Sequence, residues 1–141
     1  MTTDTEQKNM DAHWRSYVLF SAHDPAMFAV FADDIVEHQE PPIVGREALA
    51  EFNRSFWTGF SDVRATLDRV FAAGDFTFAA GRVSGTNDGP MPAFGIDRTG
   101  RKLDVGFVEV IQWRDGRAVH SWPIMDQAEV ALQLGLAEGP A

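Results

Sequence analysis

The feature that most constrains the fold is a pair of apolar segments separated by a tight turn. Residues 103–113 read LDVGFVEVIQW, residues 117–125 read RAVHSWPIM, and Asp115-Gly116 lies between them. Asp-Gly between two apolar runs predicts a two-residue β-hairpin. Side chains alternate along a strand, so every second residue of the first run shares one face. The members of that row are Leu103, Val105, Phe107, Glu109, Ile111 and Trp113. The hairpin therefore places one carboxylate on an otherwise apolar face.

Helical segments precede the strands. Thr3-x-x-Glu6 predicts a capping box, with apolar residues at helical spacing after it, and Asp24-Pro25 predicts a second start. The apolar stripe of residues 45–60 predicts an amphipathic helix, and residues 34–38 are predicted to form a short strand. Two strands are predicted next, one on each side of a turn at Gly74-Asp75. A Gly- and Pro-rich loop over 85–100 precedes the hairpin, and a short helix is predicted to begin at Asp126. Gly81 and Gly106 are candidate bend or bulge sites in these strands. Helices gathered on one face of an antiparallel sheet predict an α+β fold in a single domain, 1–141, with its core over about residues 6–136.

Composition narrows the function classes. The formal net charge of −9 disfavours nucleic acid and anionic membranes as partners, because both require a basic surface. The chain has no cysteine, which excludes disulfides, thiolate catalysis and a thiolate zinc site. The first residues lack an apolar signal core, so we expect a cytoplasmic protein.

Several short motifs together resemble a known family. FADDIVEH, VGREALAEF, FAAGD, SGT, TGR, RDGR and QLGL occur in the order and spacing of the SnoaL-like polyketide cyclases, over roughly residues 20–136. That family belongs to the superfamily of nuclear transport factor two, ketosteroid isomerase and limonene-epoxide hydrolase. The resemblance implies a cone-shaped curved antiparallel sheet wrapped around N-terminal helices and enclosing a cavity, a cystatin-like α+β barrel. It also implies chemistry without a metal or cofactor. We further expect a homodimer formed through the outer face of the sheet.

The resemblance also exposes a departure from the family's chemistry. Family cyclases close a ring by an intramolecular aldol reaction, and a carboxylate on the last strand is proposed to move the protons. The position of that aspartate falls on Pro123, so the usual family acid is missing. A cavity position that is histidine in some cyclases falls on Glu109, and a glutamine position falls on Phe107. Alignment with ketosteroid isomerase places its base on His38.

Three residues are therefore candidate acid–base groups. Glu109 would be desolvated among apolar neighbours, which raises a carboxyl pKa as a general base requires; alternatively, its face is partly exposed or lies at a dimer interface, and Glu109 pairs with an arginine. His38 can exchange a proton near neutral pH, although a lone histidine is more often a structural hydrogen-bonding residue. Asp126 lies near a second acidic family position, and helix capping explains it equally well. His120 is expected to point to the outer side of the sheet.

The candidate substrate-binding residues are mostly apolar. Tyr17 could donate a hydrogen bond to a substrate oxygen that gains charge, and Ser121 could donate one inside the cavity. The full set is Trp14, Tyr17, Phe52, Phe56, Phe60, Phe107, Ser121 and Met125. Aromatic residues at helical spacing are more often core than pocket, and in a hollow fold the same side chains can serve as both.

The resemblance, together with these residues, implies a cofactor-free enzyme that acts on a hydrophobic, carbonyl-bearing small molecule such as a polyketide, by cyclisation or isomerisation. Three alternatives stay open: ring opening of an epoxide, a non-catalytic protein that binds a hydrophobic compound, and a structural dimerisation module with a filled core. The missing family aspartate favours the binding protein. The substrate and the reaction type are not determined by the sequence.

Overall fold

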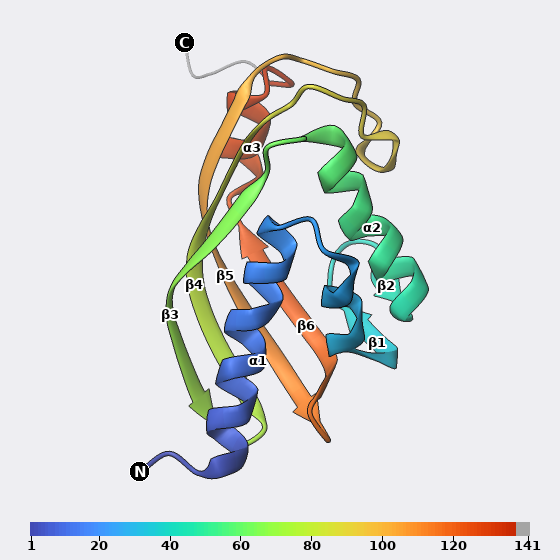
Figure 1. Cartoon of the computed structure of the whole chain (residues 1–141). Coiled ribbons are helices and arrows are strands. Elements are labelled where there is room, and N and C mark those ends of the chain that lie inside the picture. Colours follow the sequence, from blue (N-terminus) through green and yellow to red (C-terminus); the bar gives the residue numbers. More distant parts are fainter. Residues whose placement is uncertain (138–141) are drawn as a thin grey trace.

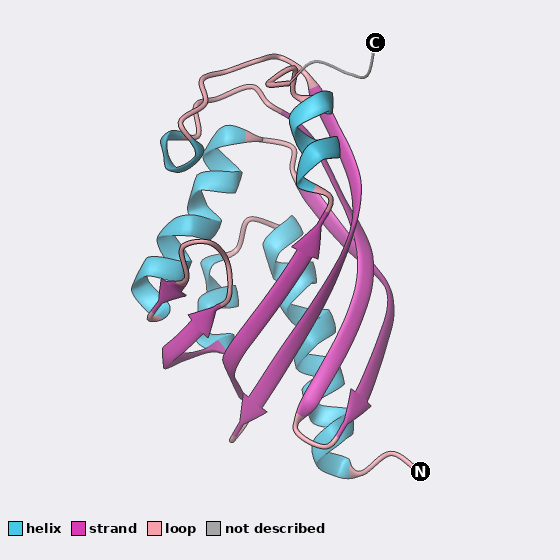
Figure 2. Ribbon diagram, turned by 180° about the vertical axis from the view of Figure 1, so that it is seen from behind, coloured by secondary structure: helices cyan, strands magenta, loops and turns pink. Residues whose placement is uncertain are grey.

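The chain forms a curved six-stranded sheet with helices packed on its concave side, which confirms the predicted α+β class (Figure 1). The computed structural model describes residues 1–137. Its helices are α1 (Asp4–Ser21), α2 (Arg46–Gly59), α3 (Gln127–Gln133) and the 3-10 helices η1 (Pro25–Val30) and η2 (Pro92–Phe94). Its strands are β1 (Phe31–Glu37), β2 (Ile43–Val44), β3 (Arg64–Ala73), β4 (Phe76–Thr86), β5 (Lys102–Arg114) and β6 (Arg117–Met125). The sheet is open, with strand order β2-β1-β6-β5-β4-β3, and β1 and β6 are its one parallel pair (Figure 2).

Local sequence signals set the helix starts. Thr3 and Glu6 form the predicted capping box of α1: the Thr3 side chain accepts from Glu6 N, and the Glu6 carboxylate accepts from Thr3 N. Asp24 caps η1 with Pro25 in its first turn, as predicted. Among the residues described, no helix has both the length and the apolar character needed to cross a bilayer.

The buried face of α1 differs from the one expected. The apolar residues at helical spacing after Glu6 are Met10, Trp14, Tyr17 and Val18; Tyr17 packs against the core, yet Trp14 and Val18 are 39% and 65% exposed. The buried positions are instead Asn9, His13, Ser16 and Phe20. This expectation was wrong because hydrogen bonds satisfy the polar side chains at the sheet: His13 bonds to strand residues, and Ser16 Oγ donates to the carbonyl of His13.

The C-terminal hairpin is built as predicted. Asp115 and Gly116 both have positive φ, 52° and 78°, which a two-residue hairpin turn of this type requires. β5 alternates strictly between buried and exposed residues over Lys102–Glu109. The register pairs Glu109 with Pro123, so these two residues lie on the same inner face.

Pro123 is accommodated because its neighbouring strand has already ended. The carbonyl of Ser121 accepts from His38 N, so this edge of β6 faces β1. Alternate residues of a strand present their backbone groups to the same edge, so the nitrogen of Pro123 faces this side too. β1 stops at Glu37, which pairs with Ser121, and therefore the missing N–H of Pro123 interrupts no ladder hydrogen bond.

Gly81 lies at a β-bulge that bends the sheet. The register of β3 and β4 shifts between Leu67 and Arg69, opposite Gly81. A Cβ on Gly81 would lie 2.1 Å from the carbonyl oxygen of Thr66, so only glycine fits there. The bulge prediction is confirmed for Gly81. The pairing of β4 with β5 is continuous past Gly106, so Gly106 does not mark a bulge.

Candidate active site

Glu109 lies on the inner face of β5 among buried apolar side chains. All six members of its row are buried, which confirms the face predicted from alternation. The glutamate itself is 8% exposed. Its Oε1 lies 3.0 Å from Nε2 of His13 on α1, and its Oε2 accepts from the Ser121 hydroxyl at 3.3 Å. The arginine partner considered for Glu109 is not among its ion-pair contacts; a buried histidine holds this position.

A second buried carboxylate, Glu37, lies at the end of β1. It is 8% exposed and pairs in register with Ser121, whose hydroxyl is 3.4 Å from Glu37 Oε1. The side-chain amide of Gln39 donates to its other oxygen. Burial, and then the negative charge of Glu109, raise the pKa of Glu37 to about 7, although the hydrogen bonds from Gln39 and Ser121 oppose the shift. Glu37 thus exchanges a proton near neutral pH, as an acid–base catalyst must.

Tyr17 forms one wall of this carboxylate pair. Its ring stacks on Phe107 with centroids 5.2 Å apart, and on His13 at 5.9 Å. Burial, followed by the negative charge of Glu109, raises the pKa of the Tyr17 phenol well above its ordinary value. The phenol therefore keeps its proton, and a hydrogen bond to Glu109 contributes to the shift.

His13 connects the carboxylates to a deeper pair of residues. Its Nδ1 lies 2.7 Å from the hydroxyl of Thr77 on β4, and Trp113 Nε1 donates to the same hydroxyl at 2.7 Å. His13 and Thr77 are both 0% exposed. A buried polar network thus joins α1 to strands β1, β4, β5 and β6.

Of the three predicted acid–base residues, Glu109 alone belongs to this cluster. His38 is exposed on the outer face, where its ring stacks on Trp122 and its Nε2 lies 3.0 Å from Nδ1 of His120. His120 points to the outer side, as expected. Asp126 is exposed and caps α3 by accepting from Glu129 N at 3.1 Å, which confirms its capping role.

The predicted substrate-binding residues are divided between core and boundary. Phe60 and Phe107 are buried in the core, and Ser121 belongs to the carboxylate cluster. The partly buried members are Tyr17, Phe52, Phe56 and Met125. Trp14 is 39% exposed and is not one of the residues of the core cluster.

Sequence reasoning missed three members of the cluster: His13, Glu37 and Thr77. His13 precedes Tyr17 by four residues, so the two share a helix face, and this spacing could have identified it. Thr77 falls in the inward row of β4, with Ala79, Gly81 and Val83. Glu37 shares the parity of Ile35, a buried residue.

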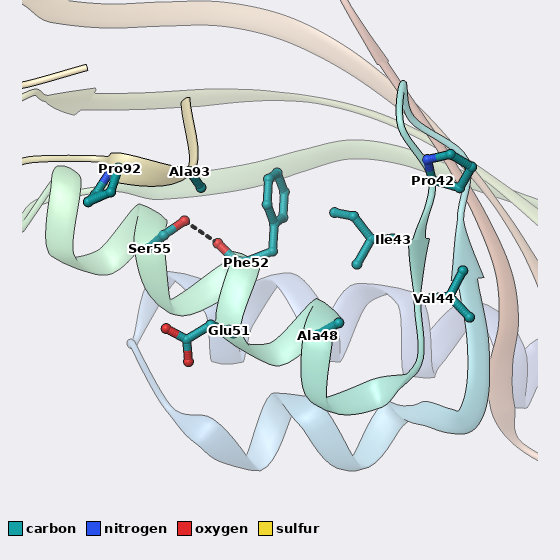
Figure 3. A pocket seen from close by; sticks show the side chains of 9 residues that line it. All are labelled: Pro42, Ile43, Val44, Ala48, Glu51, Phe52, Ser55, Pro92 and Ala93. Atoms are coloured by element: carbon teal, nitrogen blue, oxygen red, sulfur yellow. Dashed lines mark hydrogen bonds between the residues drawn. The ribbon is translucent and has the colours of Figure 1, made fainter. Parts of the chain in front are cut away.

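A hollow of about 480 Å³ lies between β2, α2 and η2 (Figure 3). Its lining residues are Pro42, Ile43, Val44, Ala48, Glu51, Phe52, Ser55, Pro92 and Ala93, so the walls are mostly apolar. Ile43 is the register partner of Glu37, and directly paired residues of antiparallel strands lie on the same face. Phe52 projects between Ile43 and the η2 segment (Figure 3). Ile43 is thus the lining residue that connects this hollow with Glu37.

Metal ligands do not gather in this region. Within residues 1–137, histidine, aspartate and glutamate side chains form no group of three that could hold a metal ion.

Comparison with known proteins agrees with the architecture. A SnoaL-like protein from Jannaschia sp. CCS1 has a TM-score of 0.87 at 19% identity, over 98% of this chain and 99% of its own. AclR, a proposed hydroxylase from Streptomyces galilaeus, has a TM-score of 0.83 at 18% identity, over 96% and 86%. IdmH, a proposed polyketide cyclase from Streptomyces antibioticus, has a TM-score of 0.74 at 26% identity, over 90% and 98%.

The comparison with curated protein sequences finds no match. The family model for SnoaL-like polyketide cyclases matches residues 12–134, nearly the whole described chain, including every member of the buried cluster. The chain therefore belongs to the SnoaL-like polyketide cyclase family.

Proposed function

We propose that this protein catalyses a proton-transfer reaction, cyclisation or isomerisation, on a hydrophobic carbonyl-bearing molecule of the polyketide type. The observation that carries the proposal is the pair of buried carboxylates, Glu37 and Glu109, joined by the hydroxyl of Ser121. Two titratable groups in one desolvated site can carry different protonation states and therefore serve as acid and base together. The family's usual aspartate is not needed in this scheme.

The two carboxylates would act in sequence. Glu109 takes a proton from the carbon next to a substrate carbonyl, and the Tyr17 phenol stabilises the enolate oxygen by a hydrogen bond. In a cyclisation, the enolate carbon attacks a second carbonyl, and neutral Glu37 gives its proton to the new alkoxide oxygen. In an isomerisation, Glu37 returns the proton at a different carbon. Either way one proton leaves the substrate and one enters it, so the reaction is balanced.

Ser121 would restore the starting state. After turnover, Glu109 holds a proton and Glu37 is ionised. The hydroxyl of Ser121 lies 3.3 Å from one carboxylate and 3.4 Å from the other. It can accept the proton from Glu109 while donating its own to Glu37, which resets both groups without water entering the site.

The apolar hollow beside Ile43 is the proposed substrate site. Its size suits a small molecule of a few rings, and the walls offer Phe52 and proline rings for contact.

The missing family acid favours the second candidate, a non-catalytic protein that binds the same class of compound. Pro123 pairs with Glu109 on the inner face, and it cannot transfer a proton.

One substitution separates these two candidates. A panel of polyketide-like carbonyl compounds is first screened by thermal shift with the wild-type protein, and the ligands found are assayed for turnover. Glu109→Gln should abolish most turnover, by about 100-fold or more, while ligand affinity changes little. Glu47→Gln, at an exposed position of α2, is the matched control and should leave both unchanged. A wild-type protein that binds the panel without converting any member would support the binding protein instead.

We also propose that two copies associate through the outer face of the sheet. This face presents an apolar patch with Phe71, Phe78, Val108 and Ile124 all at least 42% exposed. A hollow of about 320 Å³ lies in the same patch, lined by Phe76, Phe78, Val110 and Trp122. A patch of this kind favours an apolar partner, and in a chain of net charge −9 an apolar patch is where two copies repel each other least. A second copy supplies the identical surface in a two-fold arrangement.

A further inference from the structure

We propose that Thr77 and Trp113 are positioning residues that hold His13 neutral, with its single proton on Nε2, so that His13 donates to Glu109. The inference rests on the proposed function, because it assigns how the base of that reaction is oriented. The tautomer itself follows from hydrogen-bond geometry and can be measured without a substrate.

The three residues form a closed, dry chain behind Glu109. His13 and Thr77 are 0% exposed and Trp113 is 3% exposed. The chain runs from Trp113 Nε1 to Thr77 Oγ1 at 2.7 Å, on to His13 Nδ1 at 2.7 Å, and from His13 Nε2 to Glu109 Oε1 at 3.0 Å. Each of these distances suits a hydrogen bond between the two atoms.

Proton counting gives the chain a direction. The indole N–H of Trp113 can only donate, so the Thr77 oxygen accepts from it. The Thr77 hydroxyl also has a proton of its own to donate, and among the described contacts its remaining partner is His13 Nδ1. Nδ1 must then be an unprotonated acceptor, which leaves the imidazole proton on Nε2, where it points at Glu109.

The other protonation states of His13 leave a buried group without a hydrogen-bond partner. With a proton on Nδ1, the Thr77 proton loses its acceptor, and an unsatisfied buried donor costs about 1–3 kcal/mol. If His13 is neutral with its proton on Nδ1, its Nε2 is unprotonated and lies 3.0 Å from the Glu109 carboxylate oxygen. Neither atom then has a proton for a hydrogen bond unless Glu109 is itself protonated. The Nε2–H tautomer satisfies all four groups.

This arrangement serves Glu109 in two ways. The hydrogen bond from Nε2 fixes Oε1 and thereby orients the carboxylate, so that Oε2 lies next to Ser121. A neutral His13 also avoids the full positive charge that would make Glu109 a weaker base. His13 has no exposed surface, so its role is indirect.

The test is nitrogen NMR of histidine-labelled protein. The chain has four histidines, and Gln variants of the other three, His23, His38 and His120, assign His13 by elimination. At pH 7 the His13 spectrum of the wild type should show a protonated Nε2 and an unprotonated Nδ1. A proton on Nδ1, or on both nitrogens, would overturn the proposal.

Variants at Thr77 test the cause. Thr77→Val keeps the shape and removes the donor, so His13 should lose its single tautomer; Thr77→Ser restores the hydroxyl and should restore the wild-type spectrum. Trp113→Phe should produce a smaller change in the same direction, and an unchanged spectrum would remove Trp113 from the proposal. Unchanged signals from the other histidines and an unchanged circular dichroism spectrum show that a variant is folded. A Thr77→Val spectrum identical to that of the wild type contradicts the inference.

A kinetic measurement completes the test once a substrate is known. Thr77→Val should lower kcat by about tenfold with little change in KM, because His13 would no longer hold its hydrogen bond to the Glu109 carboxylate in one orientation, and Thr77→Ser should recover it. If Glu109→Gln leaves turnover intact while the NMR results hold, the proposed function fails and the tautomer assignment stands. If Glu109→Gln is inactive but the tautomer differs, the reverse is true.

Discussion

Glu37 and Glu109 come from strands β1 and β5, which β6 separates, and their carboxylates meet at the hydroxyl of Ser121. A hydroxyl has one proton and can donate it to one carboxylate at a time. Two carboxylates this close cannot both remain ionised at low cost, so the pair favours holding one proton near neutral pH. This relationship leads to the first prediction below.

Glu37 should make the protein less stable as the pH rises. Its pKa is about 7 in the folded chain against a model value of 4.5, so between these values the folded state holds a proton that the unfolded state has lost. The contribution of Glu37 to the free energy of unfolding is therefore greatest below about pH 4.5. It falls by about 3 kcal/mol as the pH rises through 7.

Urea unfolding of the wild type and of Glu37→Gln at pH 5 and pH 8 checks this. The variant has no charge to bury and should be the more stable protein at pH 8, with a smaller difference at pH 5. Glu47→Gln on α2 serves as the control. Parallel pH dependences for wild type and Glu37→Gln would show that Glu37 ionises in the folded protein without penalty.

Gly81→Ala should destabilise the sheet by about 2 kcal/mol or more. The added methyl group would overlap the carbonyl oxygen of Thr66, which is backbone and can move only if the bulge rearranges. Gly106→Ala is the matched control, because its Cβ would meet nothing closer than 3.7 Å. That variant should be neutral or more stable by up to about 1 kcal/mol. Denaturant midpoints measure both, and equal effects would contradict the steric explanation.

Asp126→Ala should cost about 1 kcal/mol through loss of the α3 cap. Asp126→Asn keeps an oxygen that can accept from Glu129 N and should stay within a few tenths of a kcal/mol of the wild type. Thermal unfolding of the two variants distinguishes them. A loss in Asn as large as in Ala would mean that the negative charge at the helix N-terminus matters more than the capping hydrogen bond.

Ile124→Glu should convert the proposed dimer into a monomer. Ile124 is 60% exposed at the outer face, and a carboxylate there would be desolvated on both sides of a two-fold interface. Light scattering on a size-exclusion column gives the mass. Val18→Glu, at an equally exposed apolar residue of α1, should leave the mass unchanged. A monomeric wild type at micromolar concentration would end this proposal.

Parts of the fold depend on short-range rules, and these could be read in advance. The Asp115-Gly116 turn, the cap of α1 at Thr3 and the cap of α3 at Asp126 are each set by neighbours within four residues. The inward position of Glu109 is equally local, because alternation holds without interruption from Lys102 to Glu109.

The choice between Glu37 and His38 shows the limit of alignment. Matching the segment to ketosteroid isomerase placed the base on His38, whereas Glu37 shares the parity of the buried Ile35 and points inward. The pairing of β1 with β6 shifts register between Phe31 and Val36, so the β6 residue that Glu37 contacts does not follow from alternation alone.

By itself, the sequence determined the α+β class, the turn and cap residues, and one carboxylate in an apolar row, since each follows from periodicity or from contacts between near neighbours. The residues that contact the Glu109 carboxylate depend on the tertiary structure. His13 approaches Glu109 from 96 residues away along the chain, and Glu37 approaches Ser121 from 84. The curvature of the sheet and the seating of α1 against it bring these groups together, and both result from packing of the whole chain.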